Sequence, residues 1–230
     1  MGTSPAEAVV AAKFLFDLLK HFQFTTPARA RGIWLSALLT RLARGAIDGE
    51  CPMFVSRANT PGAGKGLLWN LIGFICDGRA PGKTAHKVRE EHFNDEIVST
   101  LMRGPAMTVI DNVPEKARLD SATLACVLTT PTYDARAKGG AVQLSLPVRT
   151  LFFATGNGLR LSGEIERRSL VIDMEVRDTA TPWERTDLPK IEQMAKTGRA
   201  EYLSAAMTIL RAWHEAGRPT APTKCGCSYP

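Results

Sequence analysis

Eight residues between two apolar runs have the types and spacing needed to bind phosphate. They read Asn59-Thr60-Pro61-Gly62-Ala63-Gly64-Lys65-Gly66 and lie between the apolar runs 53–55 and 67–75. Glycines permit the tight turns in which successive backbone N–H groups face a phosphate, and a lysine at the start of the next helix can reach its oxygens. We therefore predict a strand, a phosphate-binding loop and a helix, with binding residues from Asn59 to Leu67.

Two positions depart from the full G-x-x-x-x-G-K-[ST] pattern of phosphate loops. Asn59 replaces the first glycine, and asparagine tolerates left-handed backbone geometry better than most residues do. Gly66 replaces the serine or threonine whose hydroxyl would bind Mg²⁺ directly. Phosphate binding is expected to survive both changes, whereas the metal site is weakened. The alternative interpretation is an ordinary Gly/Pro turn between a strand and a helix.

A carboxylate follows a second apolar run, where a metal site would need one. Val109-Ile110 leads directly to Asp111, which could hold Mg²⁺. The next residue, Asn112, cannot act as a base toward an attacking water. Three acids could substitute for it, and the sequence does not select among them: Glu90, Glu91 and Glu115. Alternatively, Asp111-Asn112 is simply a turn after a strand.

A third apolar run ends in an amide and is followed by two arginines. Phe152-Phe153-Ala154-Thr155-Gly156 leads to Asn157, which could contact the γ-phosphate or the attacking water. Arg167 and Arg168 come next, after a short predicted helix, and a guanidinium is well shaped to stabilise charge on a transferring phosphoryl group. A solvated arginine pair is the alternative interpretation.

The elements that must position these residues alternate along the chain. Apolar spacing predicts helices over 6–24, 28–43, 90–102, 119–129 and 200–216, and strands at 53–55, 106–110, 148–154 and 170–174. An Ala-Lys-Gly-Gly turn within 133–147 predicts a hairpin. Strands alternating with helices indicate an α/β fold with a parallel-rich sheet and its ligand at the carboxyl ends of the strands.

Length and composition fit one α/β domain of the larger kind. The chain has 230 residues, of which 44% are hydrophobic and 23% charged, with a net charge of +6 that favours acidic partners such as nucleic acid. We expect an N-terminal helical segment over 1–50, a core over 51–178 and a helical tail over 179–230. Five cysteines are expected to be reduced thiols, and no apolar run is long enough to span a membrane, so we expect a cytoplasmic protein.

Taken together, these motifs resemble those of the AAA+ and superfamily-three-like helicase ATPases of phages, plasmids and integrated elements. Segment 61–65 resembles the Walker A motif of that family, and segment 109–112 resembles Walker B. Segment 154–157 resembles the sensor 1 motif, and segment 163–168 resembles the segment that carries the arginine finger. The resemblance extends from about Leu15 to Pro219 and is closest to the ATPase part of element-encoded primase–helicase proteins.

The resemblance implies a P-loop NTPase fold with a three-layer core that uses ATP and Mg²⁺. Lys65 would hold the β and γ phosphates, Asp111 would organise Mg²⁺, and Asn157 would sense the γ-phosphate. The family forms rings, commonly hexamers, in which Arg167 or Arg168 would act on the site of the next subunit. The family also moves on single-stranded DNA, which Arg136 and Lys138 of the hairpin would contact in the pore.

Two other function classes stay open. One is a nucleotide-binding scaffold that no longer hydrolyses ATP and serves as a DNA-binding or assembly module, for which Gly66 and Asn112 are the best evidence. The other is a small-molecule P-loop kinase, which is weaker because such an enzyme needs neither an arginine from a second subunit nor a basic hairpin. Other replication domains or proteins of the same element could act together with this chain.

Overall fold

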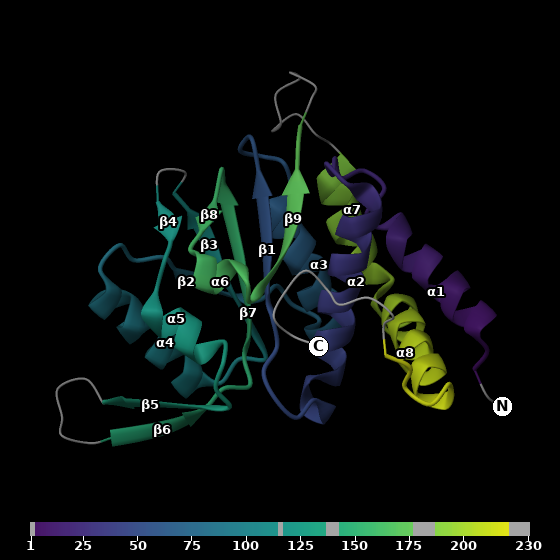
Figure 1. Cartoon of the computed structure of the whole chain (residues 1–230). Helices are drawn as coiled ribbons and strands as arrows, with labels where there is room; N and C mark the ends of the chain where they lie inside the picture. The colour runs from purple at the N-terminus through teal and green to yellow at the C-terminus, as the bar shows by residue number, and fades with distance from the viewer. Residues whose placement is uncertain (1–2, 115–116, 137–142, 177–186, 221–230) are drawn as a thin grey trace.

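A parallel sheet of five strands forms the centre of the molecule. The structure is a computed structural model and describes residues 3–114, 117–136, 143–176 and 187–220. The strand order is β2-β3-β7-β1-β9, and every pair is parallel. The strands are β1 (Met53–Ala58), β2 (Gly82–Ala85), β3 (Met107–Val113), β7 (Leu151–Asn157) and β9 (Ser169–Met174). We call the edge where these strands end the carboxyl edge, and it lies at the top of Figure 1.

Helices cover both faces of this sheet, so the molecule has three layers (Figure 1). One face is covered by α1 (Pro5–Asp17), α2 (Pro27–Ala43), α3 (Lys65–Asp77), α7 (Asp187–Thr197) and α8 (Arg199–Glu215). The other face is covered by α4 (Glu90–Arg103), α5 (Ala122–Val127) and α6 (Gly163–Glu166). The α/β class, the parallel sheet and the helices at both ends of the chain confirm the fold predicted from the sequence.

Alternation along the strands divides the core between the two faces. On β1, Phe54 packs into the cluster on the α3 face, whereas Met53 and Val55 pack into the cluster on the α5 face. Phe54 stacks on Phe153 of β7 with 5.4 Å between ring centroids. The indole N–H of Trp34 donates to the carbonyl of Leu68 at 2.9 Å, which fixes α2 against α3. The sheet is therefore buried on both faces, as expected for parallel strands.

The N-terminal and C-terminal helices pack together. Phe14 of α1 stacks on Tyr202 of α8 with 4.8 Å between centroids. Residues of α1, α2, α3 and α8 share one hydrophobic cluster. The division into segments 1–50, 51–178 and 179–230 stays a prediction, since these segments contribute to a common core.

Smaller elements complete the molecule. The antiparallel strands β5 (Thr132–Arg136) and β6 (Gln143–Pro147) form the predicted hairpin, which extends below α4 and α5 in Figure 1. A parallel pair, β4 (Arg118–Leu119) and β8 (Arg160–Leu161), lies apart from the main sheet, and a 3₁₀ turn at Arg44–Ala46 follows α2. Within the described ranges, no helix combines the length and apolar character needed to cross a bilayer.

The structure differs from the sequence predictions mainly at element ends. The first helix ends at Asp17, not near residue 24, because turns at 18–22 bring Phe24 to a bridge with Met174 at the end of β9. The helix predicted over 119–129 begins only at Ala122, where the Ser121 hydroxyl caps it by accepting from Leu124 N–H. Strand β2 was not predicted, since its four residues contain no apolar run.

Candidate nucleotide site

The loop after β1 has the backbone geometry that a phosphate site requires. Gly62 and Gly64 have φ values of 75° and 91°, in the left-handed region that favours glycine. Gly64 is the N-cap of the 13-residue helix α3, so the loop delivers the free N–H groups and the positive end of that helix dipole to one point. Ala63 is fully buried, which anchors the loop to the core. This arrangement suits an anion such as a phosphate.

Asn59 has a different role from the one inferred from its sequence position. Its φ is not positive, so it does not use the left-handed geometry that glycine would provide. Instead, its side-chain amide donates to the carbonyl of Val176 at 3.2 Å and accepts from the N–H of Val176 at 3.1 Å. Asn59 thus ties the beginning of the loop to the chain just beyond β9.

Gly66 offers no ligand to a metal, although a larger residue would fit. A Cβ built on Gly66 would meet no atom within 4 Å. The hydroxyl residue of the full phosphate-loop pattern is therefore missing without being sterically excluded. The next loop residue, Leu67, is partly buried and packs against the α3-face cluster.

Lys65 is held above the sheet by two acceptors. Its ammonium donates to Asn157 Oδ1 at 2.5 Å and to the carbonyl of Thr60 at 3.0 Å. Asn157 is the last residue of β7, the strand between β1 and β3. Partial burial lowers the pKa of Lys65, while the charge of Asp111 opposes that shift. The structure therefore brings together the lysine, amide and carboxylate that the sequence predicted for one site.

Asp111 is bound on both of its oxygens. Thr155 donates its hydroxyl to Oδ1 at 2.7 Å, and Lys83 of β2 donates to Oδ2 at 2.5 Å. Partial burial by itself would raise the pKa of Asp111, but the hydrogen bonds from Lys83 and Thr155, the charge of Lys83 and the N–H of Asn112 together lower it. Asp111 is consequently a carboxylate kept ionised at the carboxyl edge.

An irregularity in β3 shapes this corner of the site. The pairing of β3 with β7 shifts between Ile110 and Val113, and Asn112 has a φ of 54° there. The N–H of Asn112 donates to the Thr155 hydroxyl at 2.9 Å, while its side chain is exposed. A Cβ on Gly156 would lie 2.8 Å from the carbonyl of Val113, so only glycine permits this approach of β7 to β3.

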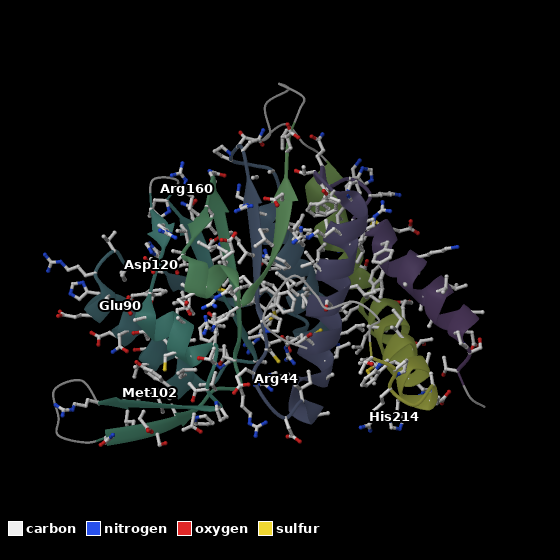
Figure 2. The ribbon with its side chains drawn as sticks, viewed as in Figure 1. Arg44, Glu90, Met102, Asp120, Arg160 and His214 are labelled. Carbon is white, nitrogen blue, oxygen red and sulfur yellow. The ribbon has the colours of Figure 1, made fainter. Side chains whose placement is uncertain are left out.

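The candidate bases are placed differently from one another. Glu90 Oε1 accepts from the Ser121 hydroxyl at 2.9 Å and from Thr123 N–H at 2.8 Å, which caps α5. Figure 2 shows Glu90 on the α4 and α5 side of the molecule. Glu91 is exposed in the first turn of α4, and Glu115 lies outside the described residues. The cap on α5 therefore explains the carboxylate at position 90 by a structural role.

The two arginines lie at the opposite, amino edge of the sheet, where the strands begin. Met53 N–H, at the start of β1, donates to the carbonyl of Arg168 at 2.9 Å. Arg168 contacts the Glu164 carbonyl at 2.5 Å and carboxylate at 2.7 Å, and Arg167 also pairs with Glu164. The six residues of β1, which span about 20 Å, separate this edge from the phosphate loop. The structure therefore does not bring either arginine to the site of its own chain.

The hairpin residues predicted to bind DNA are only partly described. Arg136 ends β5, opposite Gln143 of β6, and its side chain is exposed. Lys138 lies outside the described residues. The hairpin places Arg136 away from the phosphate loop, on the side of the molecule that holds α4 and α5.

The residues at the carboxyl edge fit a nucleotide better than a metal ion alone. Two left-handed glycines, a helix N-terminus and Lys65 together suit a polyphosphate. Among the residues that the structure describes, no group of three histidine, cysteine, aspartate or glutamate side chains could hold a metal. Mg²⁺ is commonly bound by one or two carboxylates together with substrate phosphates, and Asp111 is the carboxylate placed to do so.

Comparison with solved structures supports this architecture at the level of the fold. The sequence matches no protein-family model and none of the curated protein sequences. A solved apo structure of the NrS-1 C-terminal region matches with a TM-score of 0.53 and 16% identity, over 91% of this chain. The chain spans 48% of the length of that structure. A structure of JCV helicase matches over 96% of this chain and 70% of its own, with 14% identity and a TM-score of 0.46.

The fold and the site together indicate the class of protein. The chain has a mixed α/β fold of the P-loop NTPase type, with a parallel central sheet and helices at both ends. At 16% identity the likeness to the NrS-1 region concerns the fold.

Three contributors to the site were missed from the sequence. Lys83 contacts Asp111 from a strand that lacks an apolar run, and its partner is 28 positions away. Thr155 precedes Asn157 by two positions on β7, and this alternation could have indicated that both side chains emerge on one face. The pairing of Asn59 with Val176 spans 117 positions, and no local pattern predicts it.

Proposed function

We propose that this chain is an ATP-dependent ring ATPase that moves on single-stranded DNA during replication of a mobile element. The contact between Lys65 and Asn157 at 2.5 Å carries the proposal, because it joins the phosphate loop to the strand between β1 and β3. Lys65 binds the β and γ phosphates, Asp111 holds the metal, and Asn157 contacts the γ-phosphate or the attacking water. Bound Mg²⁺ would supply positive charge at the phosphates.

The position of the arginines supports a shared site. Arg168 is held against α6 by Glu164, with 20% of its side chain exposed, whereas Arg167 is 61% exposed. Because both lie at the edge opposite to the loop, a guanidinium can reach a nucleotide only from a second copy of the chain. A held guanidinium is better preorganised than a mobile one, so Arg168 is our first choice for this role. Ring closure, for example as a hexamer, would give every site such an arginine.

The DNA-binding part of the proposal concerns the hairpin. Arg136 is exposed at the end of β5, and a cation on a projecting hairpin can contact successive phosphates of a strand in a central pore. Lys138 is proposed to act with it. The net charge of +6 suits a polyanionic partner. A cytoplasmic location and cooperation with other replication proteins stay predictions.

One alternative function has specific support. Gly66 lacks a metal ligand, and Asn112 is an exposed amide where a base would be useful. Both features favour a scaffold that binds nucleotide without hydrolysing it and serves in DNA binding or assembly.

A complementation assay tests the motor and its shared sites. ATP hydrolysis is measured with and without single-stranded DNA, at several protein concentrations, for the wild type and for Lys65→Ala and Arg168→Ala. Each variant alone should be inactive. A mixture of the two should recover activity, because some interfaces then pair an intact lysine with an intact arginine. Nucleotide binding by the wild type without any turnover would favour the scaffold instead.

A further inference from the structure

A lysine with no role so far contacts the carboxylate that we propose as the metal ligand, Asp111. Lys83 Nζ lies 2.5 Å from Asp111 Oδ2, and 64% of the Lys83 side chain is exposed against 28% of Asp111. The partner is thus the more buried of the two, and the ammonium comes from the solvent side. The other carboxylate oxygen is taken by Thr155. Both oxygens of the proposed metal ligand therefore have donors already.

The sheet directs Lys83 toward the nucleotide side. Lys83 pairs with Val109 in the register between β2 and β3, and Val109 packs into the cluster that includes α3. The next residue, Thr84, faces the other way, because its hydroxyl contacts Thr108 at 2.7 Å and Thr100 of α4 at 3.3 Å. By alternation, Lys83 and Asp111 lie on the same face as the loop helix.

The charges around Asp111 suit a polyphosphate. Lys83 contacts Asp111 directly, and Asp111 also acts on Lys65 through its charge. Two ammonium groups and one carboxylate therefore lie close to the glycine loop, and of these two cations only Lys83 contacts the carboxylate. A compact ammonium on a flexible stem can move between a carboxylate and an incoming phosphate oxygen.

A metal ion meets two obstacles at this site. Gly66 supplies no hydroxyl ligand, and any Mg²⁺ that uses Asp111 must displace or share Lys83. Mg²⁺ gives up its water reluctantly, so a weakened ligand set that is also occupied by an ammonium disfavours it. Lysine and metal are therefore competitors for the same carboxylate oxygen.

We propose that Lys83 is a cationic residue of the nucleotide site that takes over part of the task of Mg²⁺ in binding, so that the nucleoside polyphosphate can bind without the metal that hydrolysis would still need at Asp111. This inference rests on the proposed nucleotide-binding function. Without nucleotide, Lys83 neutralises Asp111. When the polyphosphate enters, the same ammonium contacts its oxygens. The positive charge of Lys83 then compensates for the metal ligand that Gly66 lacks.

Calorimetric titration of the whole chain with ADP and with ATPγS, in EDTA and in excess Mg²⁺, tests this proposal. The variants are Lys83→Gln, which removes the charge, Lys83→Arg, which keeps it, and Lys87→Gln. Lys87 is a suitable control because it lies four residues further on and pairs with Glu96 at the surface, at 4.0 Å. Thermal unfolding of each variant shows whether it is folded.

The expected results separate the metal-free and metal-bound states. The wild type should bind in EDTA nearly as tightly as in Mg²⁺. Lys83→Gln should weaken metal-free binding about tenfold, the effect of one charge-assisted hydrogen bond, and should lower the Mg²⁺ concentration that half-saturates the metal effect. Lys83→Arg should retain most metal-free affinity, and Lys87→Gln should match the wild type.

Two results would overturn the inference in different ways. A wild type that binds only with Mg²⁺, or a Lys83→Gln variant with unchanged metal-free affinity, removes the role of Lys83 and leaves the proposed function intact. No binding of either nucleotide in either condition removes both proposals together.

Discussion

The charged side chains at the two edges of the central sheet have different kinds of partner. At the carboxyl edge, Lys65 donates to Asn157, while Lys83 and Thr155 both donate to Asp111, so each cation has a side-chain acceptor at a strand end. At the amino edge, Arg167 and Arg168 share one exposed acid, Glu164, on the adjoining helix. These contacts hold the Arg168 guanidinium in place, whereas Arg167 stays 61% exposed. The carboxyl edge is arranged to bind a small anion, whereas the arginines of the amino edge are placed to contact another molecule.

The largest expected effect concerns the amino edge. Arg168→Ala should lower ATP turnover roughly a thousandfold, because an arginine supplied by a second subunit is worth at least that much in related chemistry. Nucleotide affinity should change far less than turnover, because such an arginine stabilises charge that develops in the transition state. Steady-state hydrolysis and calorimetric binding, measured on the same preparation, check the two parts separately.

Two further variants sharpen this result. Arg103→Ala removes another exposed arginine, at the end of α4, and should leave turnover near the wild-type value. Arg167→Ala decides between the two neighbours. If Arg168→Ala weakens nucleotide binding as much as turnover, the contrast between the edges is wrong.

A smaller effect is expected from repairing the carboxyl edge. Gly66→Thr should tighten Mg²⁺-dependent ATPγS binding about tenfold, because the hydroxyl adds a charge-assisted contact to the metal, and a Cβ at this position would meet no atom within 4 Å. Gly66→Ala is the control, since it removes the same glycine but adds no ligand. An equal gain in affinity for both variants would mean that the effect comes from the stability of α3 and not from a contact with the metal.

The smallest effect concerns the hairpin. Arg136→Ala should weaken single-stranded DNA binding a few-fold and reduce the slope of log affinity against log salt by about 0.7, the value for one phosphate contact. Fluorescence anisotropy at several salt concentrations measures both quantities. Gln143→Ala alters the opposite position of the same hairpin without changing its charge. Equal salt slopes for all three proteins would exclude a phosphate contact by Arg136.

The sequence predicted the parts of this site that depend on local patterns. Apolar runs ending in Asp111 and Asn157 marked two strands and their carboxyl ends, and the glycine spacing marked the loop. Parallel strands then bring these ends together at one edge. Residue types were sufficient to predict these parts because each motif spans only about ten positions of the sequence.

Features that depend on distant pairing were not predictable in this way. The order of strands in the sheet is set by contacts between separate segments, so the position of β7 between β1 and β3 is not visible locally. Lys83 stands in a short polar strand whose placement depends on Thr84 packing against Thr108. Glu90 resembled a candidate base by type, while its hydrogen bonds to the start of α5 became visible only in three dimensions.

The pairing of Asn59 with Val176 has a mechanical meaning. Two amide hydrogen bonds fasten the first residue of the loop to Val176, two positions beyond β9, and α7 and α8 follow later in the chain. A displacement of Val176 would therefore strain the two bonds that Asn59 makes at the start of the loop. A glycine at position 59 would have no side chain to make this link. The position at which the loop departs from its first glycine is thus the position that fastens the loop to the chain beyond the edge strand β9.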